Sequence, residues 1–320
     1  MATYEKRTYL LKTEDPTHIG VGGYRLGRVD NSIIRETGTG IPKIPGTSLH
    51  GAIRAYAARL YENMAAAGQD HSQVENPDQD PICYTFGYIK HNTEEEAGDA
   101  ADSEPIAYSG VVNIFDAQVL LFPVASLHGP LWVTITGRLA DAGVAVTGLP
   151  ATWPSETVLP TSNLDNRINL GWLSLPAGSP VTLTWPEVWD KPGLQAIKER
   201  IVLVHDDLFG HIVNSNLEVR TSVSIDPKTG AAKKGALFTY EALPRATWLT
   251  MDMVIDDYRA AFPVVSQTSR TSEPLSWQAP LDVAVAGLKL IGWLGVGGMG
   301  TRGFGRVTLV GDAVIDPFSI

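Results

Sequence analysis

Residues 281–312, LDVAVAGLKLIGWLGVGGMGTRGFGRVTLVGD, place an apolar helical pattern, a glycine-rich run and a strand pattern in that order. The run at 295–305 contains six glycines in eleven positions. Gly295, Gly297 and Gly300 match G-x-G-x-x-G, but a dinucleotide site needs this motif after a strand and before a helix. The reversed order therefore excludes a dinucleotide-binding loop. Two interpretations stay open: backbone N–H groups that approach an anion closely, or a tight connection with no ligand.

Strand and helix patterns are interspersed along the rest of the chain without the regular alternation of a doubly wound fold. We expect strands at 6–13, at 32–36 and within 111–139, a hairpin within 218–241, and an amphipathic helix whose cap is Thr47 or Ser48. The sequence therefore predicts an α+β fold. We expect one domain over 1–320, with an acidic insertion at 62–108, an irregular insertion at 141–200 and a candidate thumb hairpin at 214–244.

The net charge of −10 argues at first against a nucleic-acid partner, because phosphate binding needs Lys and Arg. The charge is unevenly distributed, however. Residues 61–110 hold eleven acidic residues and one basic residue, which accounts for the whole −10, whereas residues 1–60 have nine basic and five acidic residues. The stretch at 91–104 is typical of a solvated loop. An acidic insertion thus conceals a basic first segment.

The chain has a single cysteine, Cys83, which excludes an intrachain disulfide and a cysteine-based zinc cluster. Neither the first residues nor the apolar stretch near the end has the pattern of a signal peptide or a membrane span. We therefore expect a cytoplasmic protein with no membrane partner.

A second candidate anion site lies in PKIPGTSLHGAIR, residues 42–54. The N-terminus of a helix attracts anions, and Lys43, Ser48, His50 and Arg54 lie before it or within its first turns. A capped helix start is commonplace by itself. Together with the glycine-rich run, however, it indicates a polyanionic backbone as the ligand.

These two stretches together resemble the RAMP superfamily of CRISPR-associated proteins. Further segments, THIGVGGYRLGRVDNSIIRETGTG, FDAQVLLFPVASLHG and GALFTYEALP, are similar to the repeated backbone subunit of type III-B (Cmr) effector complexes. The resemblance implies a ferredoxin-like, RRM-related core with large insertions, a β-hairpin thumb and a C-terminal glycine-rich loop. It also implies a subunit that stacks along CRISPR RNA and cuts the paired target RNA at regular intervals.

The resemblance assigns the cleavage to the aspartate of the loop after the first strand, which is Asp30 in GRVDNSIIRE. A carboxylate there can bind a divalent ion, Mg²⁺ or Mn²⁺, or position a ribose 2′-hydroxyl for attack on the adjacent phosphate. His18 lies in the same loop, and Tyr240 and Glu241 are weaker candidates for the same site. From the residues alone, Asp30 is an ordinary turn residue and His18 a structural one.

RNA binding divides between the two anion sites and the hairpin. The expected RNA-binding residues are Lys43, Ser48, His50, Arg54, Gly297, Gly298, Arg302, Arg220, Lys233 and Lys234. Their contacts would go to phosphates, which gives affinity without sequence preference. The family commonly has Lys where this chain has His50, so that contact depends on pH. The hairpin corresponds to the family's thumb or is a solvated surface hairpin.

Three functions stay open at this point. The first is the catalytic backbone subunit, a metal-dependent endoribonuclease whose partners are CRISPR RNA, complementary target RNA, other Cmr subunits and copies of itself in a helical filament. The second is the same scaffold used only for guide binding and assembly, or its type III-A (Csm) counterpart. The third is an unrelated enzyme that binds a nucleotide at the glycine-rich loop.

Overall fold

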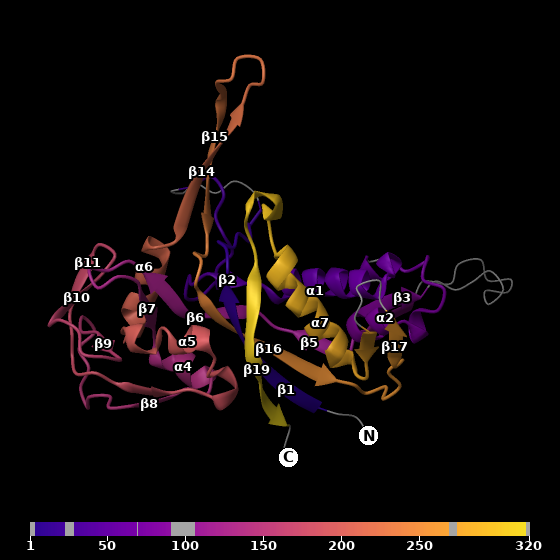
Figure 1. The fold of residues 1–320 in the computed structure, drawn as a ribbon, viewed down its shortest axis with the longest axis horizontal. Helices are drawn as coiled ribbons and strands as arrows, with labels where there is room; N and C mark the ends of the chain where they lie inside the picture. The colour runs from indigo at the N-terminus through magenta and orange to yellow at the C-terminus, as the bar shows by residue number, and fades with distance from the viewer. Residues whose placement is uncertain (1–3, 23–28, 69, 91–105, 269–273, 318–320) are drawn as a thin grey trace.

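The computed structural model describes residues 4–22, 29–68, 70–90, 106–268 and 274–317 (Figure 1). The acidic stretch at 91–104 lies outside these residues. A nine-stranded sheet forms the centre, with β2 (Lys43–Ile44) paired to β6 and β5 (Val112–Ile114) to β16 beside its main path. That path runs in the order β19 (Val307–Pro317), β1 (Tyr4–Thr13), β16 (Trp248–Asp256), β6 (Ala117–Val124), β7 (Leu131–Thr134), β13 (Ile201–Leu203) and β9 (Leu159–Pro160).

Two β-α-β units interlock at the centre of this sheet. In the first, α1 (Gly46–Tyr61) lies in the chain between β1 and β6, and in the second α7 (Pro280–Leu294) lies between β16 and β19. β1 is antiparallel to both β16 and β19, and β16 is antiparallel to β6. Each unit therefore holds one strand of the other between its own two strands. The predicted α+β class, first strand, final helix and final strand are confirmed.

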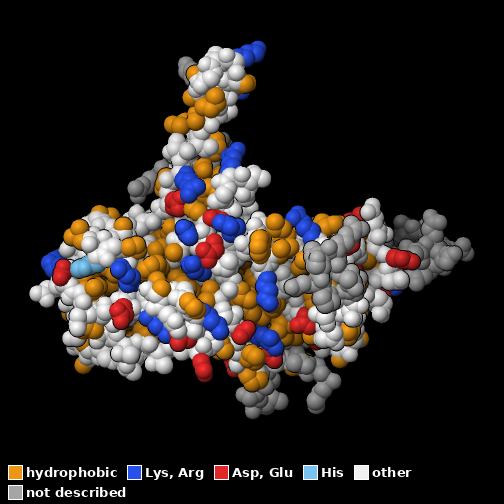
Figure 2. Space-filling model, in the orientation of Figure 1, with side chains coloured by type: hydrophobic (Ala, Val, Ile, Leu, Met, Phe, Trp, Pro, Cys, Tyr) orange, Lys and Arg blue, Asp and Glu red, His pale blue; other side chains and the backbone are white. Residues whose placement is uncertain are grey.

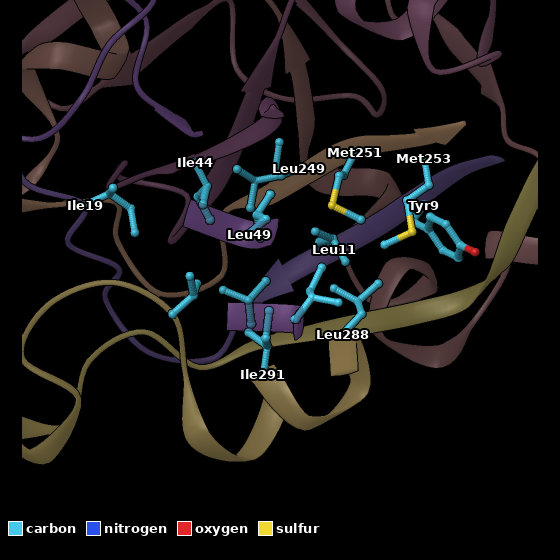
Figure 3. Packing of buried hydrophobic residues seen from close by; sticks show 14 of the residues in the cluster. Tyr9, Leu11, Ile19, Ile44, Leu49, Leu249, Met251, Met253, Leu288 and Ile291 are labelled. Carbon is cyan, nitrogen blue, oxygen red and sulfur yellow. The ribbon is translucent and has the colours of Figure 1, made fainter. Parts of the chain in front are cut away.

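Both faces of the sheet are buried. Alternate residues of a strand point to opposite faces, so neighbouring residues of one strand belong to different cores. Tyr9 and Leu11 of β1 join the core that contains Leu288 and Ile291 of α7 (Figure 3). Leu10 belongs instead to a second core with Trp132, Trp185, Trp189 and Trp248. The helices α1 and α7 thus cover one face, and residues from the 141–200 segment cover the other.

The 141–200 segment, expected to be irregular, is built from short elements that carry this second core. They are the end of α4 (Thr136–Asp141), β8 (Ala145–Thr147), β9, β10 (Arg167–Leu170), β11 (Leu173–Pro176), β12 (Thr182–Thr184), η3 (Glu187–Trp189), α5 (Pro192–Gln195) and η4 (Lys198–Arg200). Trp189 is completely buried, and its indole nitrogen donates to the Asp312 carbonyl at 3.0 Å. The segment is therefore fixed to the sheet by packing rather than by long regular elements.

The remaining elements lie around the two helices and at the base of the hairpin. They are η1 (Met64–Ala67), η2 (Pro77–Gln79), α2 (Pro81–Phe86), β3 (Gly87–Lys90) paired with β4 (Ile106–Ser109), α6 (Asp206–Ser215), β17 (Val265–Thr268) paired with β18 (Pro274–Trp277), and η5 (Gly300–Arg302). Among the described residues, no helix is long and apolar enough to cross a membrane.

A two-stranded hairpin projects from the body of the molecule (Figure 1). β14 (Glu218–Ile225) and β15 (Ala232–Ala242) are antiparallel, and their register places Arg220 opposite Tyr240. At the tip, the Asp226 carboxylate accepts from the Lys228 N–H at 2.8 Å, and Gly230 takes a positive φ of 68°. The hairpin and its turn lie where the alternation and the DPKTG sequence placed them.

Two local expectations are wrong. Helix α1 begins at Gly46 without a side-chain cap from Thr47 or Ser48, because the Gly46 N–H donates to Asp116 Oδ1 at 2.7 Å instead. The strand expected at 32–36 forms only isolated bridges, one of which pairs Gly20 with Ile33. In both places a distant segment supplies the hydrogen bonds that local sequence was expected to make.

The crossing of α1 and α7 depends on a residue without a side chain. A Cβ built on Gly287 would lie 2.2 Å from the Ile53 carbonyl oxygen. Because that oxygen belongs to helical backbone, Gly287→Ala must separate the two helices, and we expect it to lower the free energy of unfolding by about 1–3 kcal/mol. Urea denaturation of the purified chain measures the loss.

Gly51→Ala provides the matched control, because Gly51 lies in α1 and a Cβ built there meets nothing within 4 Å. Replacing a helical glycine by alanine at an open position stabilises by about 0.5–1 kcal/mol. A Gly287→Ala protein as stable as the Gly51→Ala protein would contradict the close helix crossing.

Candidate functional site

The loop that follows β1 is held between the base of the hairpin and the glycine-rich run. Thr17 and Leu243 exchange two backbone hydrogen bonds of 2.9 Å each. On the other side, the Gly298 N–H donates to the His18 carbonyl and the Gly305 N–H donates to the Pro16 carbonyl, both at 2.9 Å. Segments from the start, the last quarter and the end of the chain therefore meet at residues 16–20, which we call the clasp.

The glycines of the 295–305 run make this contact possible. Gly297 has a φ of +87°, and a Cβ built on it would lie 2.4 Å from Ile19 Cδ1 and 2.5 Å from the His18 carbonyl oxygen. The Gly298 N–H, expected on a guide phosphate, is already bonded to His18. At Gly297 and Gly298 the bare backbone therefore touches this chain's own loop. That contact corrects the expectation of an open phosphate cradle at these two residues.

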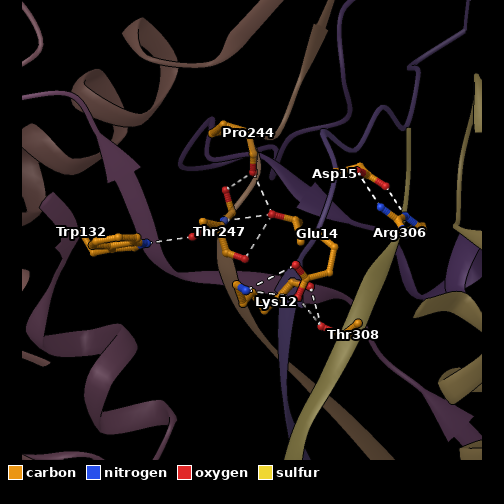
Figure 4. Close-up of polar contacts among 10 residues, drawn as sticks. Lys12, Glu14, Asp15, Trp132, Pro244, Thr247, Arg306 and Thr308 are labelled. Atoms are coloured by element: carbon orange, nitrogen blue, oxygen red, sulfur yellow. Dashed lines mark hydrogen bonds and ion pairs between the residues drawn. The ribbon is translucent and has the colours of Figure 1, made fainter. Parts of the chain in front are cut away.

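A polar network fixes the strand ends just below the clasp (Figure 4). Arg306, which follows the glycine-rich run, forms an ion pair with Asp15. Glu14 accepts from Lys12 Nζ at 3.1 Å and from Thr308 Oγ1 at 2.9 Å. The network joins the end of β1 to the start of β19, so the chain leaves the sheet toward the clasp in a defined direction.

Asp30 is exposed and is held by one residue of the hairpin. Its Oδ2 accepts from the backbone N–H of Thr239 at 2.7 Å and from the Thr239 hydroxyl at 3.0 Å, and the Asp30 N–H donates to that hydroxyl at 3.1 Å. The N–H and then the hydroxyl of Thr239 hold the pKa of Asp30 below its usual range. Asp30 therefore presents an ionised carboxylate at neutral pH.

His18 joins the hairpin to the glycine-rich run. Its Nδ1 lies 2.6 Å from the Glu241 carbonyl oxygen, and since a carbonyl only accepts, Nδ1 carries the hydrogen of that bond. The ring meets Tyr240 edge-on at a centroid distance of 6.0 Å, and the residue is only 6% exposed. His18 thus acts as a buried connector in this structure.

Glu241 and Tyr240 are neighbours on β15, so their side chains take opposite faces of the hairpin. Glu241 Oε2 accepts from Arg35 Nη2 at 2.8 Å, so the carboxylate forms an ion pair with the guanidinium. Tyr240 is buried, with its ring 5.4 Å from that of Phe304. The structure therefore brings all four predicted catalytic residues to the hairpin base, and Asp30 is the exposed one.

The expected cradle at the start of α1 is mostly committed to internal contacts. Lys43 forms an ion pair with Asp116. Arg54 is 8% exposed, and its guanidinium donates to the Ala66 carbonyl at 2.8 Å. Burial, and then the charge of Arg54, lower the pKa of His50, so this ring is neutral at pH 7. Ser48 is half-buried in the first turn of the helix. The expectation that Arg54 faces guide phosphates is therefore wrong, because its side chain points into the protein.

A cleft of about 520 Å³ lies beside this helix start. Gly46, Thr47, His50 and Phe86 line it together with residues 109–110 and 112–115. His50 meets Phe86 edge-on, at a centroid distance of 5.3 Å. Because the ring is neutral, the cleft offers hydrogen-bonding groups and an aromatic wall rather than positive charge.

Exposed Lys and Arg side chains are spread over the body of the molecule, and further ones lie on the hairpin and the glycine-rich run. Figure 2 shows Lys and Arg side chains at the tip and around the base of the hairpin. The Arg220 guanidinium lies 4.7 Å from the centre of the Phe304 ring and pairs with Glu218 at 2.5 Å. Arg302 and Lys233 are exposed, while the side chain of Lys234 lies outside what the structure describes.

No group of three or more His, Cys, Asp or Glu residues in the described parts of the chain is arranged to hold a metal ion. Asp30 offers one exposed carboxylate. That donor fits the way Mg²⁺ is usually held, by one or two carboxylates together with substrate phosphates and water. It does not form a closed protein site.

Three residues that shape the site were not foreseen: Thr239, Arg35 and Asp116. Arg35 lies five residues after Asp30, and its role depends on Glu241, which only the fold brings near. Asp116 caps a helix that starts seventy residues earlier. No local pattern marks these pairings, because each partner lies in a different element.

The sequence model of the RAMP superfamily matches residues 10–308. The CRISPR system Cmr endoribonuclease Cmr4 of Pyrococcus furiosus is 28% identical over 254 residues, which are 74% of this chain and 77% of that protein.

Solved structures show the same fold. A chain of the type III-B Cmr-beta complex bound to cognate target RNA aligns with a TM-score of 0.59 at 14% identity, covering 95% of this chain and 96% of that one. Oligomeric Cmr4 from Pyrococcus furiosus aligns with a TM-score of 0.53 at 20% identity, covering 99% and 100%.

Asp116 provides a test of how the start of α1 is held. Burial by itself would raise the pKa of Asp116, but Lys43 and the Gly46 N–H outweigh it and hold the pKa below its usual value of 3.8. We expect Asp116→Asn to lower the free energy of unfolding at pH 7 by about 1 kcal/mol, a value reduced by the partial exposure of the pair.

The pH dependence of this loss follows from the lowered pKa. The stabilisation by Asp116 is fully present above pH 3.8 and disappears as the pH falls through the lower folded-state pKa, so the wild type and Asp116→Asn converge there. Urea midpoints between pH 3 and 7 measure it. Asp165→Asn is the control, because the Asp165 side chain is 82% exposed. A constant difference across this range would contradict the assignment.

Proposed function

The chain belongs to the RAMP superfamily, and we propose that it is the repeated backbone subunit of a type III-B (Cmr) effector complex that cleaves target RNA. The carrying observation is the exposed carboxylate of Asp30, fixed by Thr239 at the base of a hairpin with exposed cations. The similarity to Cmr4, named an endoribonuclease, supports the same activity. Such a subunit takes part in antiviral defence and acts in the cytoplasm.

The proposed fold class is ferredoxin-like and RRM-related, and the order of the central strands supports it. Across the sheet the four central strands lie in the order β19, β1, β16, β6. If they are numbered by their order in the chain, this is 4-1-3-2, with one helix in each β-α-β unit. The segments 62–108, 141–200 and 214–244 are then additions to one domain. The last is the thumb, which projects from the body (Figure 1).

The proposed reaction is an intramolecular transesterification at a phosphodiester of the target RNA. The ribose 2′-oxygen attacks the adjacent phosphorus, and the bond to the 5′-oxygen of the next nucleotide breaks. That oxygen takes a proton from solvent water, so the products are a cyclic phosphate and a 5′-hydroxyl. Asp30, ionised at neutral pH because of its bonds from Thr239, accepts the proton of the 2′-hydroxyl. His18, Tyr240 and Glu241 support the loop through their contacts with one another and with Arg35.

A divalent ion, Mg²⁺ or Mn²⁺, would be held by Asp30 together with phosphate oxygens of the RNA and water. Such an ion stabilises the negative charge that develops on the phosphate. The site is thus completed only when RNA is present. This agrees with the single exposed carboxylate at the hairpin base.

The RNA partners are a CRISPR RNA guide and its complementary target, bound along copies of this subunit in a helical filament with other Cmr subunits. Arg220, Arg302 and Lys233 are the exposed cations assigned to phosphates, and the sequence adds Lys234. Phosphate contacts of this kind accept any guide sequence. Ser48, half-buried beside the cleft at the start of α1, is a further candidate.

A second candidate is the same scaffold acting only in guide binding and assembly, here or in a type III-A (Csm) complex. It is favoured by the internal contacts of His18, Tyr240 and Glu241, which leave Asp30 as the exposed group. The nucleotide-binding enzyme is disfavoured, because Gly297 and Gly298 contact the clasp. Whether the assembled complex cleaves target RNA distinguishes the catalytic subunit from the assembly subunit.

Asp30→Ala tests the assignment in the complex assembled from this chain, its neighbouring subunits and a guide. We expect evenly spaced cuts in a labelled complementary RNA with wild type and Mg²⁺ or Mn²⁺. The variant should cleave about 10²- to 10⁴-fold more slowly, the usual contribution of a positioned base, with target binding unchanged. Asp165→Asn, an exposed carboxylate on another part of the surface, is the control.

An Asp30→Ala complex that still produces the ladder would rule out Asp30 as the base. A wild-type complex that holds guide and target but never cuts would instead establish the assembly subunit.

Arg302→Gln tests the assignment of the exposed cations. Each phosphate contact to single-stranded RNA contributes about 0.7 to the slope of log affinity against log salt, so we expect a weaker complex and a slope reduced by about that amount. Arg54→Gln should leave the slope unchanged, because the Arg54 guanidinium is buried. Equal slopes for wild type and Arg302→Gln would remove Arg302 from the RNA interface.

A further inference from the structure

The segment that carries Asp30 lies beside the hairpin and is joined to it by one isolated bridge. Asn31 forms a parallel bridge with Tyr240. The Asn31 N–H donates to the Thr239 carbonyl at 3.0 Å, and the Glu241 N–H donates to the Asn31 carbonyl at 3.0 Å. These two backbone bonds tie Asn31 to β15.

The side chain of Thr239 makes a different kind of contact. Its hydroxyl accepts from the Asp30 N–H at 3.1 Å and donates to Asp30 Oδ2 at 3.0 Å. The Thr239 N–H donates to the same oxygen at 2.7 Å. Both bonds to the carboxylate go to Oδ2, so Oδ1 is the oxygen that they leave for a substrate proton. The hydroxyl thus restrains the rotation of the carboxylate, which the backbone bonds of Asn31 do not.

We infer that Thr239 is a positioning residue that orients the Asp30 carboxylate for cleavage and makes that carboxylate move with the hairpin. The inference rests on the proposed function, because it gives Asp30 the role of base. The physical argument is that a base must lie within hydrogen-bond reach of the proton it removes, and that an error of about 1 Å costs up to about 100-fold in rate.

Coupling to the hairpin follows from the same contacts. Thr239 pairs directly with Thr221 of β14, so the residue that orients Asp30 belongs to the ladder of the projecting hairpin. A displacement of the hairpin base is transmitted to Asp30 through two hydrogen bonds to its carboxylate and a third to its backbone N–H. RNA that holds the hairpin in one position therefore also fixes Asp30, which links correct binding of the duplex to cleavage.

Thr239→Val and Thr239→Ser test the inference in the assembled complex with guide and excess complex over target. Valine keeps the β-branched shape and the backbone N–H but removes the hydroxyl, and serine restores the hydroxyl. We expect Thr239→Val to lower the maximal cleavage rate about 10- to 100-fold, with the half-saturating complex concentration unchanged. Thr239→Ser should recover most of the rate.

Thr221→Val is the matched control, because it removes a threonine hydroxyl from the paired position of the same hairpin. We expect it to cleave as wild type does. Thr239→Ala makes the same comparison as Thr239→Val if the valine variant fails to assemble.

Three results would overturn the inference. They are a wild-type rate in Thr239→Val, a serine variant as slow as the valine variant, and a loss confined to the half-saturating concentration. Each of these leaves Asp30 and the proposed ribonuclease in place. Cleavage that survives Asp30→Ala, or a wild-type complex that never cuts, would instead refute the proposed function and this inference with it.

Discussion

The site depends on the backbone clasp at residues 16–20, because it joins three parts of the chain that are far apart in sequence. Hydrogen bonds of 2.9 Å tie it to Leu243 at the hairpin base and to Gly298 and Gly305 of the glycine-rich run. Backbone groups that are buried without a hydrogen-bond partner cost free energy, so the clasp, the hairpin base and the glycine-rich run depend on one another. Asp30, which lies further along the chain, is fixed to the same hairpin base by its own bonds to Thr239.

This constraint explains why the glycines occur where they do. A side chain at Gly297 would collide with Ile19 and with the His18 carbonyl, and the positive φ of Gly297 disfavours any other residue. The bare backbone of the run therefore lets two loops approach each other closely, while the Arg302 side chain within the run stays exposed. Catalytic loops are commonly positioned by a rigid scaffold in this way.

The sequence predicted the elements whose signals are local. The order of helix, glycines and strand at 281–312, the first strand and the hairpin with its DPKTG turn all appear in the structure. The position of Asp30 came from the resemblance to a family rather than from its own pattern. The roles of Arg54 and Asp116 were not predictable, because Arg54 points into the protein toward Ala66 and Asp116 caps a helix distant in sequence. Long-range pairing decides both.

The central claim is that Asp30 meets the target RNA at the base of the hairpin. The most direct measurement is a structure of the assembled complex with guide and an unmodified target RNA, kept intact by EDTA, which removes the divalent ion. The account predicts an Asp30 carboxylate oxygen within about 3.2 Å of the 2′-oxygen at each cleavage position, directly or through one water, with Thr239 still bonded to Asp30. A scissile phosphate beside the cleft at the start of α1, with Asp30 turned away from RNA, would contradict the account.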